Sequence, residues 1–179
     1  MAEVRRRSPH VILVGLPGAG KSVVGQRSAS RLGRPFVDFD AEIERRAGMP
    51  IAGIFRDRGE AGFRYLELEL TRELAAGGGA ILSPGGGWIA VPGALELLRP
   101  PARMIYLRAS PDVALLRMGP GRAGRPLLTT AEPLATLQRL LEAREPLYRL
   151  ADDVVDVNLI AVEEVTDIVV RLAADLRGE

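Results

Sequence analysis

The stretch Gly15-Leu16-Pro17-Gly18-Ala19-Gly20-Lys21-Ser22 decides the fold of this chain. It matches the phosphate-binding loop pattern G-x-x-x-x-G-K-[ST] in full. The apolar run at residues 10–14 predicts a buried strand before it, and residues 22–32 predict a helix after it. A strand that enters a glycine turn and then a helix N-terminus directs several backbone N–H groups, and the positive end of the helix dipole, at one point. The stretch therefore predicts a binding site for a polyphosphate.

Composition singles out Lys21 within this loop. The chain has 24 Lys and Arg residues, and Lys21 is the only lysine among them. Arginine has a wide planar fork that would crowd a phosphate already surrounded by backbone amides, whereas the lysine ammonium is a compact point charge. We therefore expect Lys21 to bind phosphate.

Length and composition predict one ordinary globular domain. The 179 residues suffice for a real core, and 47% hydrophobic and 26% charged residues are typical of globular proteins. The net charge of +1 gives no reason to expect a nucleic-acid or anionic-membrane partner. No apolar run approaches the ~20 residues of a membrane span, and the N-terminus lacks a signal-peptide core. We expect a cytoplasmic protein that binds neither nucleic acid nor membrane.

The chain has no cysteine and a single histidine, His10. Thiol catalysis, disulfides and zinc sites built from cysteine and histidine are therefore excluded. His10 stands at the entrance of the first predicted strand, where we expect a structural role. A general base must then be an aspartate or a glutamate.

Short apolar runs alternate with longer amphipathic stretches along the chain, which predicts a parallel sheet covered by helices. We expect an α/β fold in three layers, with a five-stranded parallel sheet and helices on both faces. The expected strands lie at residues 10–14, 35–39, 80–83, 104–107 and 154–157. The expected helices lie at residues 21–32, 40–47, 60–75, 92–99, 111–118, 132–148 and 162–176.

Ligands of such a sheet bind at the carboxyl ends of its strands, and two candidate stretches follow predicted strands there. Asp38 and Asp40 follow the second strand, where one carboxylate can help Ser22 to hold Mg²⁺ while the other orients or deprotonates a hydroxyl. Alternatively, Asp40 only caps the following helix. Gly85-Gly86-Gly87 follows the third strand and suggests close approach of the backbone to a ligand. Trp88, the only tryptophan, is a candidate for the wall of the same pocket.

Three arginines beyond the phosphate loop are further candidates. Arg64 and Glu67 are neighbours on one face of a predicted helix, either as a solvated ion pair or as a guanidinium held ready for a carboxylate. Residues 119–128 contain three glycines, two prolines and two arginines. That composition suits a lid that brings Arg125 over a phosphate, or an ordinary surface loop. Arg144 lies near the end of a long predicted helix.

Taken together, these residues resemble the shikimate kinase family. The resemblance covers roughly Val11 to Asp156. The phosphate loop is shared by many enzymes, whereas the ordered set of the other pieces is specific. The matching pieces are Gly15–Ser22, Phe36-Val37-Asp38-Phe39-Asp40, Ile54-Phe55 with Gly59-Glu60, Phe63-Arg64 with Glu67, Ser83-Pro84-Gly85-Gly86-Gly87, Arg125-Pro126-Leu127-Leu128, and Arg144 with Pro146-Leu147-Tyr148.

The resemblance implies a single P-loop kinase domain over residues 1–179, similar to the nucleoside monophosphate kinases. It implies a substrate-binding helical segment near residues 40–75 and a lid near residues 117–130. The implied reaction transfers the γ-phosphate of ATP to the 3-hydroxyl of shikimate, in the pathway to chorismate and the aromatic amino acids. Mg²⁺ is the implied cofactor, ATP and shikimate are the expected small-molecule partners, and we expect a monomer.

The resemblance also implies roles for individual residues. The implied catalytic residues are Lys21, Asp40 and Arg125. The implied ATP-binding residues are Gly18, Ala19, Gly20, Lys21, Ser22, Val23, Arg117 and Arg125. The implied shikimate-binding residues are Asp40, Arg64, Glu67, Gly85, Gly86, Gly87 and Arg144, with both arginines on the carboxylate and Glu67 orienting Arg64. Ser22 ligates Mg²⁺ directly, and Asp38 does so through water.

Two other interpretations compete with this one. A gluconate kinase or a nucleotide kinase of the same fold needs no pair of arginines for a carboxylate, so Arg64 with Arg144 argues against both. Shikimate-kinase-like modules also serve as ligand-sensing domains in some transcription regulators. A sensing domain would not need Lys21, Asp38 and Asp40 together. The apolar segment at residues 157–159 leaves the preference for adenine open.

Overall fold

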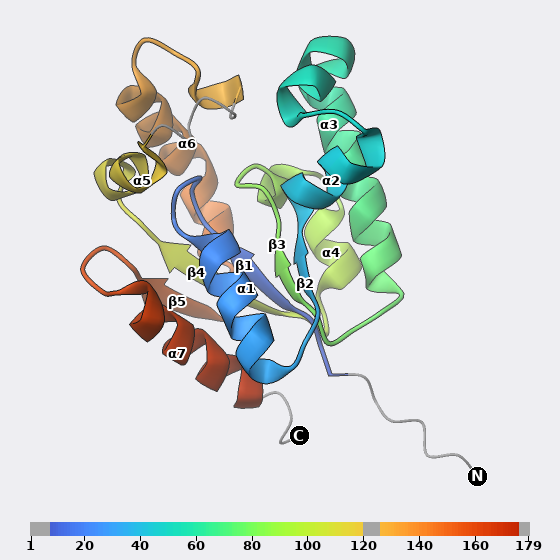
Figure 1. The fold of residues 1–179 in the computed structure, drawn as a ribbon, viewed down its shortest axis with the longest axis vertical. Helices are drawn as coiled ribbons and strands as arrows, with labels where there is room; N and C mark the ends of the chain where they lie inside the picture. The colour runs from blue at the N-terminus through green and yellow to red at the C-terminus, as the bar shows by residue number, and fades with distance from the viewer. Residues whose placement is uncertain (1–7, 120–125, 176–179) are drawn as a thin grey trace.

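The computed structural model describes residues 8–119 and 126–175. Within these residues, five parallel strands form one sheet, as the sequence predicts (Figure 1). The strand order in this sheet is β2-β3-β1-β4-β5. Each strand lies within two residues of its predicted range. The strands are β1 (Val11–Val14), β2 (Phe36–Asp38), β3 (Ile81–Ser83), β4 (Arg103–Arg108) and β5 (Asp153–Asp156).

The helices also follow the predicted order. Ser110 shows why one of them begins where it does, because its side chain accepts a hydrogen bond from the Val113 N–H and Pro111 occupies the first turn. The α-helices are α1 (Lys21–Leu32), α2 (Phe39–Ala47), α3 (Ile51–Ala75), α4 (Ala94–Leu98), α5 (Pro111–Met118), α6 (Pro133–Tyr148) and α7 (Val162–Ala174). Two short 3₁₀ turns are η1 (Trp88–Ala90) and η3 (Pro126–Leu128).

The start of α3 differs from the prediction. The helix begins at Ile51 rather than at residue 60, and its axis is interrupted at Gly59, which has φ 68° and ψ −179°. A positive φ of this kind favours glycine, because a side chain would be strained there. The sequence prediction recognised only the part of α3 that follows this break.

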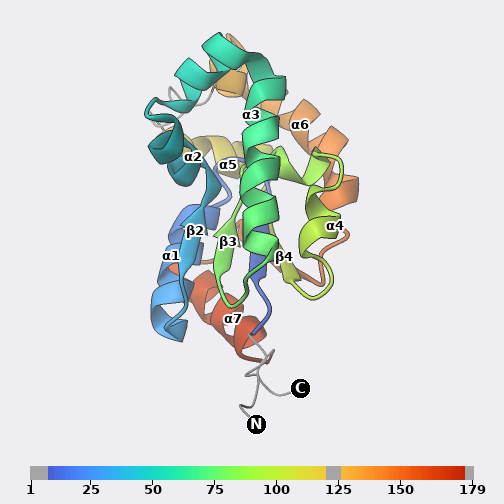
Figure 2. The same cartoon turned by 90° about the vertical axis from the view of Figure 1, so that its right-hand side faces the viewer.

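Two apolar clusters cover the two faces of the sheet, and this confirms the three-layer arrangement. Successive residues of β1 alternate between them: Ile12 and Val14 pack with α2, α3 and α4, whereas Val11 and Leu13 pack with α1 and α7. Figure 1 shows α1 and α7 on one side of the strands, and Figure 2 views the sheet from the side of α3 and α4.

The position of β1 determines where the site lies. From β1 the chain builds β2 and β3 on one side of it and β4 and β5 on the other, so β1 is the point at which the strand order reverses. Ligands of open parallel sheets bind at this point, beyond the carboxyl ends of the strands. The phosphate loop follows β1 directly, between the segments that follow β3 and β4.

His10 has the structural role that the sequence predicts. Its Nδ1 accepts a hydrogen bond of 3.2 Å from the Ala80 N–H, so the proton lies on Nε2, which donates to the Leu74 carbonyl at 3.0 Å. The ring thereby ties the end of α3 to the start of β3.

None of the helices in the described part of the chain combines the length and the apolarity that crossing a bilayer requires.

Candidate active site

The phosphate loop is pressed against β4 and α5, and two of its glycines make this possible. A β-carbon on Gly15 would lie 2.5 Å from the Leu107 carbonyl oxygen, and one on Gly18 would lie 2.3 Å from that of Ala114. Both glycines also have positive φ. Lys21 is only 8% exposed, and its Nζ donates 2.9 Å hydrogen bonds to the carbonyls of Gly15 and Leu16. These bonds hold the ammonium inside the curve of the loop.

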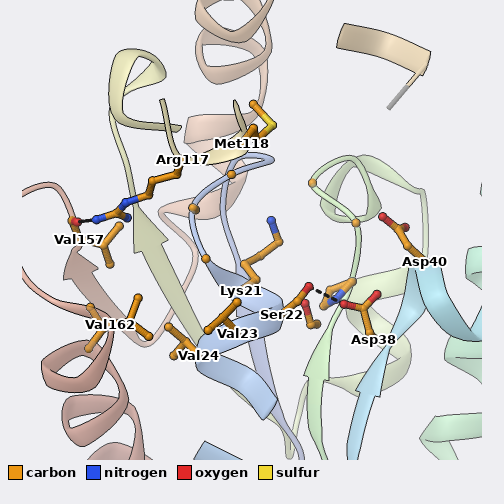
Figure 3. A pocket seen from close by; sticks show the side chains of 18 of the residues that line it. Lys21, Ser22, Val23, Val24, Asp38, Asp40, Arg117, Met118, Val157 and Val162 are labelled. Carbon is orange, nitrogen blue, oxygen red and sulfur yellow. Dashed lines mark hydrogen bonds between the residues drawn. The ribbon is translucent and has the colours of Figure 1, made fainter. Parts of the chain in front are cut away.

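A cavity of about 460 Å³, which we call the loop cavity, opens in front of this ammonium (Figure 3). Its size is in the range of pockets for small ligands. The predicted residues of the phosphate loop, both aspartates and part of the glycine triplet line it together. The predicted residues in its wall are Gly18, Ala19, Gly20, Lys21, Ser22, Val23, Asp38, Asp40, Gly85, Gly86 and Arg117.

Ser22 and Asp38 meet at one side of the loop cavity. The Ser22 hydroxyl donates to Asp38 Oδ2, and Asp38 Oδ1 accepts from the Ala41 N–H at 3.2 Å (Figure 3). Asp38, rather than Asp40, therefore caps α2, and the capping alternative for Asp40 is wrong. Asp40 lies in the first turn, and its side chain points toward the cavity.

The oxygens of Ser22 and Asp38 suit Mg²⁺, which prefers oxygen ligands and keeps several waters. Within residues 8–119 and 126–175, no group of three or more His, Cys, Asp or Glu side chains could hold a metal ion. A magnesium ion at this pair would therefore take further ligands from water and from a bound polyphosphate.

The opposite side of the loop cavity is apolar. Arg117 reaches across it from α5, and its guanidinium donates to the Val157 carbonyl at the end of β5 (Figure 3). Val157, Ile160, Val162 and Val165 line this side. A guanidinium beside aliphatic side chains is suited to pack against a planar base.

Each glycine of the triplet faces a different part of the site. A β-carbon on Gly85 would lie 3.0 Å from Glu67 Oε1 and 3.2 Å from Asp40 Oδ1. One on Gly86 would lie 2.9 Å from Pro17 of the phosphate loop, and one on Gly87 would lie 2.3 Å from the Arg64 guanidinium. The absence of side chains in the triplet therefore lets four groups, Glu67, Asp40, Pro17 and Arg64, lie directly against its backbone.

A second cavity, which we call the arginine cavity, brings Arg64 and Arg144 together. These residues come from α3 and α6, 80 positions apart, and both line the cavity. The phenylalanines Phe55 and Phe63 and the glycine triplet form other parts of its wall. Two arginines and an apolar wall suit a small carboxylic acid with a ring.

Arg64 and Glu67 form a partly buried pair, not the solvated one that helix spacing alone also allowed. Arg64 Nη1 donates to Glu67 Oε2 at 2.6 Å, and Glu67 is fully buried. Two further contacts of Arg64 were missed in the sequence: Nη2 donates to Glu60 at 3.0 Å, and the guanidinium lies 5.3 Å from the centre of the Phe63 ring. The i,i+4 spacing of Glu60 and Arg64 was the available signal.

Burial raises the pKa of Glu67 to about 7. The nearby Asp40 raises this pKa further, whereas Arg64 and Arg144 lower it. Among the described residues, no group forms a hydrogen bond with Glu67 Oε1, the oxygen that faces Gly85. A carboxyl that titrates near neutral pH therefore lies beside both arginines and Asp40.

We expect Glu67→Gln to change how stability depends on pH. Between its ordinary pKa of 4.5 and its folded-state pKa of about 7, Glu67 holds a proton in the folded chain that the unfolded chain has released. The free energy of unfolding of the parent should therefore fall as the pH rises through this window. Over this window, the free energy of unfolding of the parent should fall by roughly 1–3 kcal/mol more than that of Glu67→Gln. Denaturant unfolding from about pH 5 to about pH 8 measures it.

Glu42→Gln is the matched control for this measurement. Arg45 and Arg46 lower the pKa of Glu42 to about 2, so Glu42 carries no proton anywhere in the window tested. Its replacement should leave the slope between pH 5 and pH 8 unchanged. If the free energy of unfolding changed with pH in the same way for the parent and for Glu67→Gln, this result would contradict a titration of Glu67 near pH 7.

Trp88 and Arg125 are two further residues that the sequence singled out. Trp88 does not line either cavity, so that interpretation is wrong: its ring is fully buried, contacts Phe39 edge-on at 6.2 Å, and donates from Nε1 to Thr71 at 2.9 Å. Trp88 belongs to the core beneath the glycine triplet. Arg125 lies outside the described residues, as do residues 120–124 of the predicted lid.

Comparisons with known proteins agree with this geometry. The family model described as shikimate kinase matches residues 17–173. The shikimate kinase of Nitrobacter winogradskyi is 46% identical over 155 residues, which cover 87% of this chain and 72% of that protein. The one from Burkholderia pseudomallei is 47% identical over 148 residues, which cover 82% of this chain and 80% of that protein.

The solved structures include a close match. The shikimate kinase from Acinetobacter baumannii, in complex with shikimate, has a TM-score of 0.88 and 36% identity, with 93% of both chains covered. The residues that the family model matches include Gly18–Ser22 of the phosphate loop, the glycine triplet, Arg64 and Arg144. The chain belongs to the shikimate kinase family.

Proposed function

We propose that this chain transfers the γ-phosphate of ATP to the 3-hydroxyl of shikimate, with ATP in the loop cavity and shikimate in the arginine cavity. The product is shikimate 3-phosphate, an intermediate of chorismate and aromatic amino acid biosynthesis. The proposal includes Mg²⁺ as the cofactor and action as a monomer.

One observation carries the assignment of the two cavities. Asp40, Gly85 and Gly86 line both of them, so the cavities adjoin at these three residues. A phosphate near Lys21 and a ring held by Arg64 and Arg144 would therefore meet beside Asp40. Reacting groups must lie about 3 Å apart for an effective transfer, and adjoining cavities allow this.

The residues of the junction have distinct proposed roles in the transfer. The Asp40 carboxylate orients the 3-hydroxyl and accepts its proton as the hydroxyl oxygen bonds to the γ-phosphorus and the bond to the β-phosphate oxygen breaks, which releases ADP. Lys21 and the loop N–H groups stabilise the charge that develops on the phosphate oxygens. Arg125 is proposed to add a second positive charge there from the lid.

Further roles concern binding rather than chemistry. Mg²⁺, held by Ser22 directly and by Asp38 through water, neutralises phosphate charge when it is bound. Arg117 and the apolar wall beside Val157 are proposed to hold the adenine. Glu67 keeps the fork of Arg64 directed at the shikimate carboxylate, while Arg144 contacts the carboxylate from α6.

The first experiment is an ADP-coupled assay of the parent protein with ATP and either shikimate or gluconate. We expect turnover with ATP and shikimate, and none with ATP and gluconate. Turnover with gluconate and none with shikimate would contradict the proposal and favour a polyol kinase of the same fold.

The carboxylate clamp is tested by Arg144→Ala. The change should raise KM for shikimate roughly 10- to 100-fold, because charge-assisted hydrogen bonds to the carboxylate are lost, and should leave KM for ATP within about two-fold. A shikimate analogue with the carboxylate reduced to an alcohol should be a poor substrate of the parent. The KM for this analogue should differ less between the parent and Arg144→Ala than the KM for shikimate does.

Arg149→Ala is the matched control. Arg149 follows the same helix, is exposed, and pairs with Glu145 at 2.9 Å. Its replacement removes one positive charge without touching the arginine cavity and should leave both Michaelis constants unchanged. Equal effects of the two substitutions would mean that overall charge, and not a clamp, controls the affinity for shikimate.

A further inference from the structure

The last turn of α6 contains a buried tyrosine to which the proposed reaction assigns no role. Tyr148 lies one helical turn after Arg144, on the same face of the helix, and is 1% exposed. Its hydroxyl donates a hydrogen bond of 2.6 Å to the Gly86 carbonyl. The Arg144 guanidinium lies near this hydroxyl and lowers its pKa, and since a guanidinium has only donors, the tyrosine oxygen is the atom that can accept from it.

The Tyr148 hydroxyl thus lies between two parts of the site. On one side it lies near Arg144, which lines the arginine cavity; on the other it holds the carbonyl of Gly86, which lines both cavities. Gly86 in turn lies against the phosphate loop, because a β-carbon there would be 2.9 Å from Pro17 and 3.3 Å from the Gly15 carbonyl oxygen. A continuous path of contacts therefore runs from Arg144 through Tyr148 and Gly86 to the phosphate loop.

The chemistry of the hydroxyl suits a fixed link. Burial raises the pKa of Tyr148 to about 12, so the hydroxyl keeps its proton at neutral pH and remains the donor to Gly86. The tyrosine ring also stacks on Tyr106 of β4, with ring centres 5.1 Å apart and an angle of 28° between the planes. The stacking and the hydrogen bond to Gly86 both restrict the position of this side chain.

We propose that Tyr148 is a positioning residue for the transfer: its hydroxyl anchors the Arg144 guanidinium to the Gly86 carbonyl and so sets where the shikimate carboxylate lies relative to the phosphate loop. This inference rests on the proposed function, in which Arg144 binds that carboxylate. Arginine has a flexible side chain, and an anchor within hydrogen-bond reach reduces the freedom that must be lost when substrate binds.

Tyr106 provides a matched control for this role. It stacks on Tyr148 and is equally buried, at 1% exposure. Across residues 8–119 and 126–175, however, its hydroxyl has no hydrogen-bond partner. Tyr106→Phe and Tyr148→Phe each remove one buried hydroxyl from the same stacked pair, and only the second removes a link to the site.

The test measures KM for shikimate, KM for ATP, kcat and Tm of the full chain. Tyr148→Phe should raise KM for shikimate about 5- to 10-fold, the effect of one lost hydrogen bond of ordinary strength, with KM for ATP within about two-fold. Tyr106→Phe should leave both constants within about two-fold. In an Arg144→Ala background, adding Tyr148→Phe should change KM for shikimate less than about two-fold, because the anchored group is already absent.

Each other outcome overturns the inference. An unchanged KM for shikimate in Tyr148→Phe would show that the hydroxyl positions nothing. Equal losses for both substrates with a lower Tm, or equal losses in Tyr106→Phe, would show a structural role only, and a persistent effect without Arg144 would show that Arg144 is not the anchored group. If the parent fails to phosphorylate shikimate, the proposed function itself has failed; if the parent turns over and Tyr148→Phe behaves like it, only the inference has failed.

Discussion

Replacing Lys21 by methionine is expected to lower kcat about 10³-fold while the protein stays folded. The ammonium lies inside the phosphate loop, bonded to the carbonyls of Gly15 and Leu16, where it can follow charge that moves onto the transferred phosphate. Methionine has a similar length and no charge, so it fills the same space. The loss should appear mainly in kcat, because the interaction strengthens in the transition state.

The control for this substitution is Arg31→Met on the same helix. Arg31 lies in the last turn of α1, is half exposed, and pairs with Asp167 of α7. Replacing Arg31 by methionine removes one positive charge far from the phosphate loop. This substitution should leave kcat unchanged and have a small effect on Tm. Turnover of Lys21→Met within a few-fold of the parent would exclude Lys21 from the chemistry.

Asp40→Asn is the second substitution with a large expected effect. Asparagine keeps the shape of the side chain but cannot accept the proton of the 3-hydroxyl, so kcat should fall by about 10²- to 10³-fold. KM for ATP should barely change, because the proposed phosphate ligands are the loop and Lys21, which this substitution leaves in place. Stability should also change little, since Asp38 rather than Asp40 accepts the capping hydrogen bond of α2.

Glu42→Gln separates the role of Asp40 from a general effect of charge. Glu42 also lies in the first turn of α2, but it pairs with Arg45 and Arg46 and lines neither cavity. Both substitutions remove one negative charge near the positive end of the same helix dipole. A normal kcat for Asp40→Asn, or an equal fall for Glu42→Gln, would contradict a base at Asp40.

Comparison of the prediction with the structure separates local from long-range information. The phosphate loop, the five strands and most helix positions could be predicted, because they depend on neighbouring residues: glycines that permit positive φ, apolar periodicity, and caps such as Ser110. The approximate edge of the sheet where the site lies also followed from the sequence, since parallel strands all end on one side. The predicted start of α3 was wrong because the helix is interrupted at Gly59, and only the part after this residue was recognised as helical.

The sequence by itself determined the phosphate loop, the parallel α/β architecture and the residue types available for the chemistry, with Lys21 as the only lysine and no thiol. Only the tertiary structure decided which of these residues meet. It placed Arg64 and Arg144 at one cavity, gave each glycine of the triplet a different neighbour, buried Trp88 in the core and linked Tyr148 to Gly86. It also raised the pKa of Glu67. The physical reason is that dihedral preferences and periodicity act between near neighbours in the chain, whereas burial, desolvation and the convergence of charges depend on how distant elements pack.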